Sequence, residues 1–301
     1  MVGKRLRKHL TWKRGAIGGG LLGAALITAV LLLPGCLPPE MDEAAEAMAH
    51  LPRQSYSASL TGGAFEVSYV ASGDPTGPRV ILIHGTPGAA DNWGFLLADP
   101  PAGMEVVAVD RPGFGQTTPK REVVRLDDHA RAIAPLLVER RGVKPVVVGH
   151  SYGGPVAARL AVDYPDRVGG LVLAAAALDP DLEDIYWYQH VGEWAAVSWL
   201  VPEPLRHCNR EILALEEELR TLAPRLAAVG VPVEIVHGTD DDLVPYANVA
   251  FMQRAFSGAP VRVDRLDGAN HFLPWLHVDA LRSAIMRVVD AQSGGATQPA
   301  P

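Results

Sequence analysis

Cysteine is nearly absent from this sequence of 301 residues, which contains only Cys36 and Cys208. A fold held together by a set of disulfides is therefore excluded. The count allows one bridge, but Cys36 lies in a segment that gives it another role, described below. We therefore expect no intramolecular disulfide, and we expect Cys208 to be an unreactive thiol in a peripheral helix.

Clusters of positive charge are also missing from most of the chain. Lys and Arg total 27 against 34 Asp and Glu, and six of the 27 lie before residue 15. Without residues 1–35, 21 cations face 34 anions, a net charge of −13. Such a body repels polyanions, and it has no basic tract longer than a pair such as Arg140-Arg141, so no nucleic-acid partner is expected.

An uncharged apolar run from Gly15 to Leu33 follows six cations, which are Lys4, Arg5, Arg7, Lys8, Lys13 and Arg14. A basic segment followed by an apolar one is typical of an export signal or a membrane anchor. Nineteen uncharged residues are just enough to span a bilayer. We therefore predict that residues 1–35 direct export, with the cations inside and the body outside. The absence of a twin-arginine pair favours general secretion.

The end of this segment, Leu33-Pro34-Gly35-Cys36, resembles a bacterial lipobox, in which the cysteine is lipidated and becomes the new N-terminus. Pro34 departs from that pattern, which prefers a small or β-branched residue there. Three outcomes stay open: a lipoprotein anchored at Cys36, an uncleaved N-terminal anchor, or another cleaved signal. The expected location is the bacterial cell envelope, with the body tethered to a membrane.

Beyond this segment, short apolar runs alternate with helical patterns. Residues 36–57 are Pro-flanked and rich in Ala and Glu, typical of a tether that carries at most one short helix. From residue 58 to 292, strand-like runs such as RVILIHG, MEVVAVDRP and KPVVVGHS are separated by helix-compatible segments. Such alternation predicts an α/β fold with a mostly parallel sheet covered by helices on both faces. A helical insertion is expected at about residues 179–229, and a disordered tail at residues 293–301.

The pentad Gly149-His150-Ser151-Tyr152-Gly153 lies between the strand-like VVV and the start of an apolar helix. Glycine at both flanking positions avoids collisions across a sharp strand-to-helix turn, so this setting favours Ser151 as a nucleophile over an ordinary turn serine. A serine hydroxyl also needs a base to take its proton, and the base needs a group that orients it.

A glycine-containing loop, His84-Gly85-Thr86-Pro87-Gly88, ends an earlier strand. A developing oxyanion requires preorganised N–H donors, and glycine lets the backbone approach closely. We predict that the backbone N–H groups of Thr86 and of Tyr152 are the donors, the latter at a helix N-terminus where the dipole also favours negative charge.

The segment TDDDLVP follows the strand-like VPVEIVHG, and LDGANHFLPW places His271 after the last strand. Three consecutive aspartates are compatible with a solvated loop, a cation site or one carboxylate that orients a histidine. The order Ser, Asp, His along the chain favours the last interpretation. Neither a metal site nor a cofactor is implied.

Five segments in order make residues 58–292 resemble the α/β-hydrolase family. HGTPG is similar to its oxyanion loop, DRPGFGQT to its Asp-Arg-Pro-Gly-x-Gly segment, GHSYGG to its nucleophile elbow, HGTDDDLVP to its acid motif and GANHFLPW to its histidine motif. The resemblance implies that Asp241 is the acid of a Ser151-His271-Asp241 triad, while Asp179 and Asp181 stay as alternatives. It also implies that His84 braces the loop and that Asp110 and Arg111 fix its neighbour.

Family members that open epoxides or displace halide carry aspartate at the elbow, so Ser151 favours acyl chemistry. In this family the insertion covers the active site, and here residues 186–199 hold five of the chain's nineteen aromatic residues (six Phe, six Trp, seven Tyr). Packing within the insertion, contact with an apolar substrate and contact with lipid stay open. As substrate-pocket residues the sequence suggests Trp93, Trp187, Trp194 and Trp275.

The sequence thus predicts an exported, membrane-tethered serine hydrolase acting on small to medium apolar carboxylic esters without a cofactor. A carbon–carbon bond hydrolase or cofactor-free oxidoreductase of the same fold would share the triad, but such relatives are usually intracellular. A binding or assembly protein on this scaffold is the remaining alternative, and it would have no need of all three triad residues.

Overall fold

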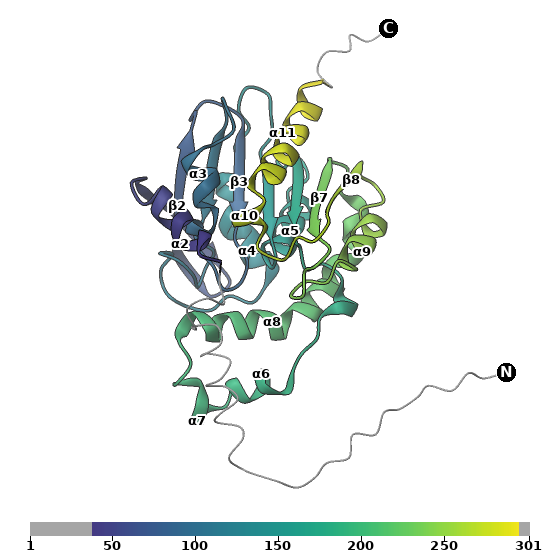
Figure 1. The fold of residues 1–301 in the computed structure, drawn as a ribbon. Helices are drawn as coiled ribbons and strands as arrows, with labels where there is room; N and C mark the ends of the chain where they lie inside the picture. Colours follow the sequence, from purple (N-terminus) through teal and green to yellow (C-terminus); the bar gives the residue numbers. More distant parts are fainter. Residues whose placement is uncertain (1–37, 295–301) are drawn as a thin grey trace, which may run out of the picture.

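A computed structural model describes residues 38–294, built around one eight-stranded sheet (Figure 1). The strands lie in the order β1-β2-β4-β3-β5-β6-β7-β8. β2 pairs antiparallel with β1 and β4, and all other neighbours are parallel. The strands are β1 (Arg53–Leu60), β2 (Gly63–Gly73), β3 (Arg79–Ile83), β4 (Glu105–Val109), β5 (Val146–His150), β6 (Gly170–Ala174), β7 (Val233–Gly238) and β8 (Val261–Leu266). The predicted α/β fold with a mostly parallel sheet is confirmed.

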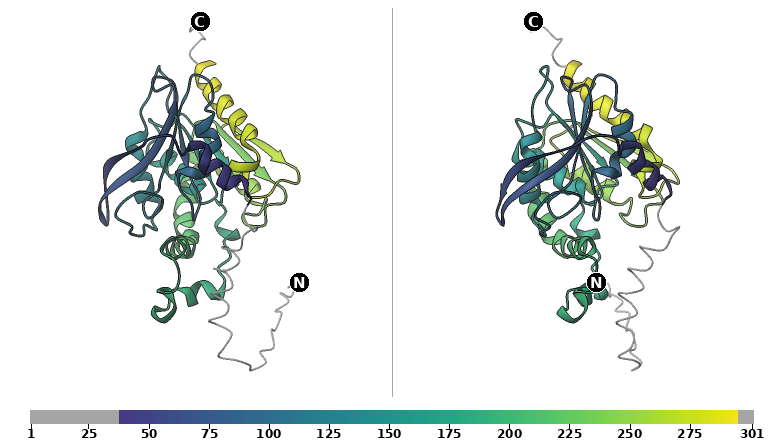
Figure 2. Two further views of the ribbon diagram at one scale, coloured as in Figure 1. Left: turned by 60° about the vertical axis from the view of Figure 1, so that its left-hand side comes forward. Right: turned by 90° about the vertical axis from the view of Figure 1, so that its left-hand side faces the viewer.

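Helices cover both faces of the sheet (Figure 2). The α-helices are α2 (Glu40–Met48), α3 (Gly94–Ala98), α4 (Leu126–Ile133), α5 (Gly153–Asp163), α6 (Trp187–Gly192), α7 (Ala195–Ser198), α8 (Glu203–Leu222), α9 (Asn248–Ala255), α10 (Leu273–Leu276) and α11 (Val278–Gly294). Four 3₁₀ helices join them: η1 (Ala90–Trp93), η2 (Ala134–Leu136), η3 (Pro180–Leu182) and η4 (Ala223–Ala228).

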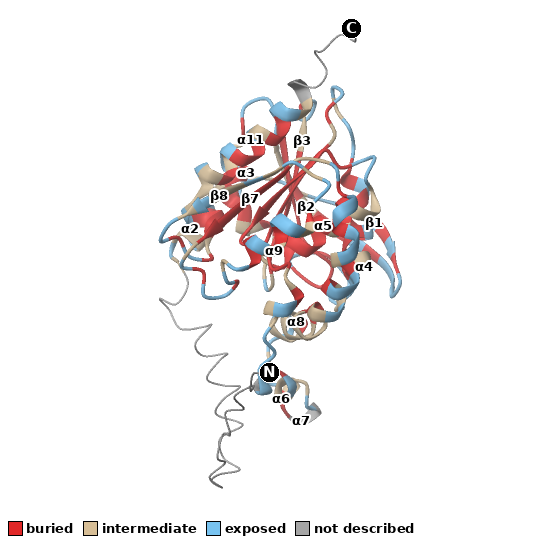
Figure 3. Cartoon of the chain, turned by 90° about the vertical axis from the view of Figure 1, so that its right-hand side faces the viewer, coloured by how far each residue is buried: buried red, intermediate tan, exposed pale blue. Residues whose placement is uncertain are grey.

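Successive side chains of a strand point to opposite faces of the sheet, so the core consists of two layers, one on each face. The central strands are buried on both faces (Figure 3). On β3, Ile81 and Ile83 point into the layer that holds α4, α5 and α9. Val80 and Leu82 point into the opposite layer with α3, α10 and α11. The near-continuous apolar runs in the sequence follow from this double burial.

The N-terminal boundary differs from the sequence prediction. The predicted tether, residues 36–57, is part of the fold from α2 onward, and β1 begins at Arg53. α2 buries Ala44 and Met48, while β1 is an edge strand whose polar sequence RQSYSASL buries only Ala58 and Leu60. A strand with so few buried positions carries no clear apolar alternation, which explains why the sequence did not reveal it. The predicted signal or anchor segment, residues 1–35, and Cys36 lie outside the described residues.

The predicted insertion between two strands is a set of helices at the carboxyl edge of the sheet. η3, α6, α7, α8 and η4 all lie between β6 and β7, in the interval where the sequence showed no strand. Figure 1 shows α8 directly against the body and the shorter α6 and α7 farther out. We call residues 179–229 the cap. At the C-terminus α11 continues to Gly294, and the rest of the predicted tail lies outside the described residues.

Candidate active site

Ser151 occupies the sharp turn between β5 and α5, with its backbone in the left-handed region at φ 54°. Non-glycine residues rarely adopt this conformation, and such strain concentrates at functional sites. The flanking glycines make the turn feasible: a Cβ on Gly149 would lie 2.2 Å from the Gly153 carbonyl oxygen, and one on Gly153 would lie 2.3 Å from the Ile83 carbonyl oxygen. Ser151 is half-buried while its neighbours are buried, so the turn presents this residue to the outside.

Asp241 and His271 come together from the loops that follow β7 and β8. The His271 Nδ1–H donates to Asp241 Oδ2 over 2.8 Å, and the carboxylate side chain is fully buried. The other oxygen, Oδ1, accepts from the backbone N–H groups of Leu243 and Val244 at 3.0 and 2.8 Å. Burial raises the pKa of Asp241, but the hydrogen bond and charge of His271 outweigh burial and hold the pKa below its ordinary value. An ionised Asp241 fixes the tautomer of His271 and leaves its Nε2 available to accept a proton.

The other acidic candidates lie elsewhere. Asp240 and Asp242 are exposed on either side of buried Asp241. Asp179 accepts from the Asp181 N–H at the start of η3, and Asp181 pairs with Arg220 on the surface of the cap. Of these carboxylates only Asp241 contacts His271.

Two further buried histidines surround this pair, and neither was singled out from the sequence. His150 Nε2 donates to the His271 carbonyl oxygen over 2.9 Å, and their ring centroids are 4.7 Å apart. Burial, reinforced by His271, lowers the pKa of His150 to about 3, so this ring is neutral. His237 Nε2 donates to the Val244 carbonyl oxygen and lies 3.6 Å from Asp241 Oδ2. The two histidines hold the backbone on each side of the Asp241-His271 pair.

The loop after β3 lies directly beside Ser151. A Cβ built on Gly85 would be 2.9 Å from Ser151 Cβ, so glycine is required for this approach. Among the described residues, neither the Thr86 nor the Tyr152 backbone N–H donates a hydrogen bond. Two unpaired donors on the two segments that meet at Ser151 are what an oxyanion hole requires.

His84 braces this loop from inside the core. Its Nδ1–H donates to the Gly85 carbonyl oxygen over 2.7 Å, and its Nε2 accepts from the Arg111 backbone N–H over 3.0 Å. Burial and then the Arg111 charge hold the pKa of His84 well below its ordinary value, in agreement with a neutral ring that donates at one nitrogen and accepts at the other. Asp110 also has a structural role: it accepts from the Ala90 N–H over 2.7 Å and pairs with Arg53 at 2.5 Å.

In the part of the chain that the structure describes, residues 38–294, no hydrogen bond joins Ser151 to His271. The connection between them is indirect, because His150 precedes Ser151 in the chain and holds the His271 carbonyl oxygen. In proteins without substrate, such catalytic contacts are often long and tighten only when substrate binds.

The four tryptophans suggested for the substrate pocket occupy different environments. Trp93 is fully buried in the core layer beneath α2 and α3, so the expectation that it lines the pocket is corrected. Its indole packs edge-on against His150 with centroids 6.4 Å apart, which gives it a supporting position. Trp275 is also buried and meets His150 edge-on at 5.8 Å. Trp187 begins α6 and Trp194 immediately precedes α7, and they are 64% and 62% exposed.

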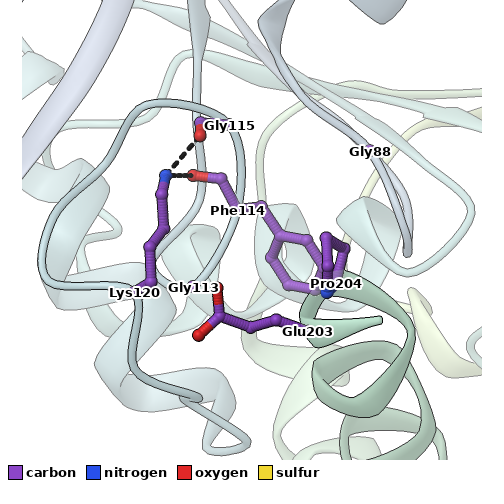
Figure 4. Close-up of a pocket in the computed structure, with 7 residues that line it drawn as sticks. All are labelled: Gly88, Gly113, Phe114, Gly115, Lys120, Glu203 and Pro204. Atoms are coloured by element: carbon purple, nitrogen blue, oxygen red, sulfur yellow. Dashed lines mark hydrogen bonds between the residues drawn. The ribbon is translucent and has the colours of Figure 1, made fainter. Parts of the chain in front are cut away.

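A cavity of about 160 Å³ lies beside the loop after β3, where the start of α8 meets the loop after β4 (Figure 4). Its lining combines apolar side chains, glycines and one residue of each charge: Gly88, Gly113, Phe114, Gly115, Lys120, Glu203 and Pro204. The Lys120 ammonium donates to the carbonyl oxygens of Phe114, Gly115 and Thr117, so its donors are already used. None of the four tryptophans lines this cavity.

Within residues 38–294 no group of three or more metal-ligating side chains gathers. In that same part of the chain no helix combines the length and the apolar character that crossing a bilayer demands. Cys208 is a free thiol on α8, and burial followed by the Glu211 charge raises its pKa to about 12, which makes it unreactive near neutral pH.

Comparisons with known proteins agree with this architecture. A profile of the alpha/beta hydrolase fold matches residues 78–197. A dihydrolipoyllysine-residue acetyltransferase component of the acetoin cleaving system of Cupriavidus necator is 43% identical over 96 residues, 32% of this chain and 26% of that protein. A 2-hydroxy-6-oxononadienedioate/2-hydroxy-6-oxononatrienedioate hydrolase of Pseudomonas sp is 24% identical over 264 residues, 74% of this chain and 91% of that protein. The chain thus spans about a quarter of the first relative and most of the second.

Among solved structures, a putative lipase from Acinetobacter baumannii superposes with a TM-score of 0.62 at 18% identity. The superposition covers 87% of this chain and 99% of the lipase chain. At this level of identity the likeness concerns the fold alone.

Proposed function

Because this chain has the α/β-hydrolase fold with serine at its elbow, we propose that it is a serine hydrolase acting on small to medium apolar carboxylic esters. One observation carries the proposal: Ser151 is strained at φ 54° beside two unpaired N–H groups, on the same edge of the sheet as the buried Asp241-His271 pair. A binding protein has no use for that combination.

The reaction follows from these groups. Ser151 Oγ attacks the ester carbonyl carbon while His271 Nε2 takes the hydroxyl proton, and the Thr86 and Tyr152 N–H groups stabilise the oxyanion. When the tetrahedral intermediate collapses, His271 returns the proton to the departing alcohol. Water then attacks the acyl-enzyme by the same route and releases the acid. Asp241 keeps its charge throughout and stabilises the imidazolium that forms in each half-reaction.

Apolar substrates are supported by the cap. Ile185, Tyr186, Trp187, Trp194, Trp199 and Leu200 are exposed on its outer part. Large exposed apolar side chains gathered in one segment are typical of contact with an apolar ligand or surface.

The test is active-site labelling of the body, residues 37–301, with a fluorophosphonate probe. We expect stoichiometric labelling at Ser151, and loss of labelling and of p-nitrophenyl ester hydrolysis by at least about 10³-fold in Ser151→Ala and His271→Ala. Ser59→Ala, an exposed serine on β1, is the matched control and keeps both. Retained hydrolysis in both Ser151→Ala and His271→Ala overturns the mechanism, and folded wild type that is never labelled points to a binding protein.

A second candidate, carbon–carbon bond hydrolysis, is favoured by the relative from Pseudomonas sp, whose alignment covers most of both chains. The same three residues would serve, so labelling alone does not separate the two reactions. Turnover of a 2-hydroxy-6-oxo-dienoate acid with no turnover of p-nitrophenyl acetate, butyrate or octanoate would select this candidate.

We also propose that residues 1–36 hold the body at a bacterial membrane, through lipidated Cys36 or an uncleaved anchor. The fold supports a close attachment, because α2 begins at Glu40 and is packed on the body. Only residues 37–39 separate Cys36 from that helix, and three residues reach at most about 10 Å. The body would therefore rest against the membrane surface.

A further inference from the structure

A buried ion pair joins the cap to the body. Glu211, near the middle of α8, and Arg111, just after β4, are 1% and 0% exposed. Arg111 Nη1 and Nη2 contact Glu211 Oε1 and Oε2 at 2.5 and 3.1 Å, a bidentate arrangement. His129 Nε2 also lies 3.0 Å from Glu211 Oε1. Burial raises the pKa of Glu211, but the Arg111 charge and the His129 hydrogen bond prevail and keep the carboxylate ionised.

Stability alone does not account for such a pair. Moving two charges out of water costs about as much as their attraction returns, and well-packed apolar residues often serve a fold equally well. A buried ion pair is better explained by the geometry that it imposes on its neighbours.

The neighbours in question belong to the loop after β3, residues 84–88, which contains Thr86 and which we call the oxyanion loop. Arg111 Nε donates to the His84 carbonyl oxygen over 3.1 Å, and Nη2 donates to the Gly85 carbonyl oxygen over 2.8 Å. The guanidinium also stacks on the Tyr152 ring, with its central carbon 4.7 Å from the ring centroid. One side chain therefore contacts both segments that supply the proposed oxyanion donors.

The Gly85 contact determines where the Thr86 N–H points. The carbonyl of Gly85 and the N–H of Thr86 belong to the same trans peptide plane, in which the two groups point in opposite directions. When Arg111 and His84 hold that carbonyl oxygen, they fix the direction of the Thr86 N–H. The Arg111 guanidinium is in turn held by Glu211, which comes from the cap.

We propose that Glu211 is a positioning residue for the oxyanion hole, so that α8 of the cap completes the catalytic geometry through Arg111. This inference rests on the proposed hydrolase function. The cap is then a part of the catalytic machinery as well as a cover. When α8 is displaced, the direction of the Thr86 N–H is no longer fixed.

The test compares Glu211→Gln with Glu218→Gln. Glu218 is a matched control, because it lies on the same helix and its Oε2 accepts a cap-to-body hydrogen bond over 2.9 Å, but from the Leu126 N–H at the start of α4. With a p-nitrophenyl ester, we expect kcat to fall about 10- to 100-fold in Glu211→Gln with KM within about threefold, since misplacing a donor weakens binding of the transition state more than that of the substrate. Glu218→Gln should leave both constants within about twofold.

The affinity for a trifluoromethyl ketone distinguishes positioning of the oxyanion hole from a purely structural role, which would not weaken this affinity selectively. Ser151 Oγ adds to its carbonyl, His271 takes the proton, and the resulting oxyanion occupies the hole. Its affinity should fall in Glu211→Gln by the same factor as kcat/KM, while the affinity for the neutral alcohol product stays unchanged. Folded Glu211→Gln with wild-type kcat, or an equal loss in Glu218→Gln, overturns the proposal.

A second variant and a hydrogen-exchange measurement cover the two cases in which these kinetics cannot be obtained. If Glu211→Gln does not fold, Glu211→Asp replaces it in the test. Aspartate keeps the charge but is one methylene too short for both guanidinium contacts. An intermediate kcat in Glu211→Asp supports the proposal, and a wild-type kcat overturns it. If wild type hydrolyses no ester, the proposed function fails, and amide hydrogen exchange of residues 84–92 still decides the coupling. Faster exchange there in Glu211→Gln than in Glu218→Gln supports it, and equal exchange overturns it.

Discussion

At the scale of the residue, burial and hydrogen-bond partners decide which side chains around Ser151 are charged and which are neutral. Asp241 keeps its charge because His271 and two backbone N–H groups compensate for its burial. His150 and His84 have no such carboxylate partner, so burial holds both in the neutral form. The carboxylate thus stays charged where partners compensate for its burial, and the two imidazoles stay neutral where burial dominates.

The neutral state of His150 has a consequence for stability. In the unfolded chain its imidazole binds a proton near pH 6.5, whereas in the folded chain its pKa is about 3. Between these values the unfolded state binds more protons, so the free energy of unfolding falls as the pH is lowered. From pH 7 to 5 His150→Gln, which removes this titration, should lose about 2 kcal/mol less than wild type.

Urea unfolding at pH 7, 6 and 5 measures this difference. His84 and His237 titrate in both proteins, so the comparison isolates His150. Parallel curves of stability against pH for wild type and His150→Gln would mean that His150 takes up its proton at the same pH in the folded and unfolded chains, which would contradict a lowered pKa in the folded protein.

At the scale of the element, the helix α2 shows how closely the segment before β1 is built into the body. It packs against α3, η1 and α10. Gly94, the first residue of α3, has no room for a side chain, because a Cβ there would lie 1.8 Å from the Ala44 carbonyl oxygen of α2. The backbone of α2 is therefore in direct contact with α3.

Gly94→Ala should accordingly destabilise the protein. Overpacking against backbone costs about 1–3 kcal/mol in the free energy of unfolding. Gly230→Ala is the control, because a Cβ there meets no atom within 4 Å, and its effect should stay within about 0.5 kcal/mol. Chemical denaturation of the two variants measures the difference, and equal stabilities would show that α2 does not pack on α3 in solution.

Helix α8 illustrates what element patterns do and do not reveal. The spacing of Leu215, Leu219 and Leu222 predicts its buried face, and these residues enter the core as that spacing requires. Glu211 has no local signal that separates it from the acidic residues that follow in the same helix. Its partner Arg111 lies 100 residues away, so only the folded chain reveals the pair.

At the scale of the whole molecule, the proposed membrane attachment leads to a direct prediction. The full-length chain should sediment with bacterial membranes and resist extraction by high salt, because an acyl or apolar anchor is not held by charge. The chain that starts at residue 37 should stay in the supernatant. Metabolic labelling with a fatty-acid analogue should mark the full-length protein, and Cys36→Ser should lose the label.

The outcomes separate the three N-terminal alternatives. Unchanged labelling in Cys36→Ser would refute lipidation at that residue. Membrane association without any label would indicate an uncleaved anchor, and a released full-length product would indicate another cleaved signal and contradict the tether.

The sequence by itself determined the fold class through local patterns, and it suggested the residues proposed for chemistry through motifs that resemble those of a known family. Strand and helix periods predict a layered α/β sheet, and glycines around Ser151 predict a tight turn whatever lies beyond it. Tertiary structure decided what depends on distant partners: that Trp93 is core, that residues 40–57 belong to the fold, that His150 supports His271, and that Glu211 reaches the oxyanion loop through Arg111. Such contacts join segments that are far apart in the chain, and neither spacing nor composition records them.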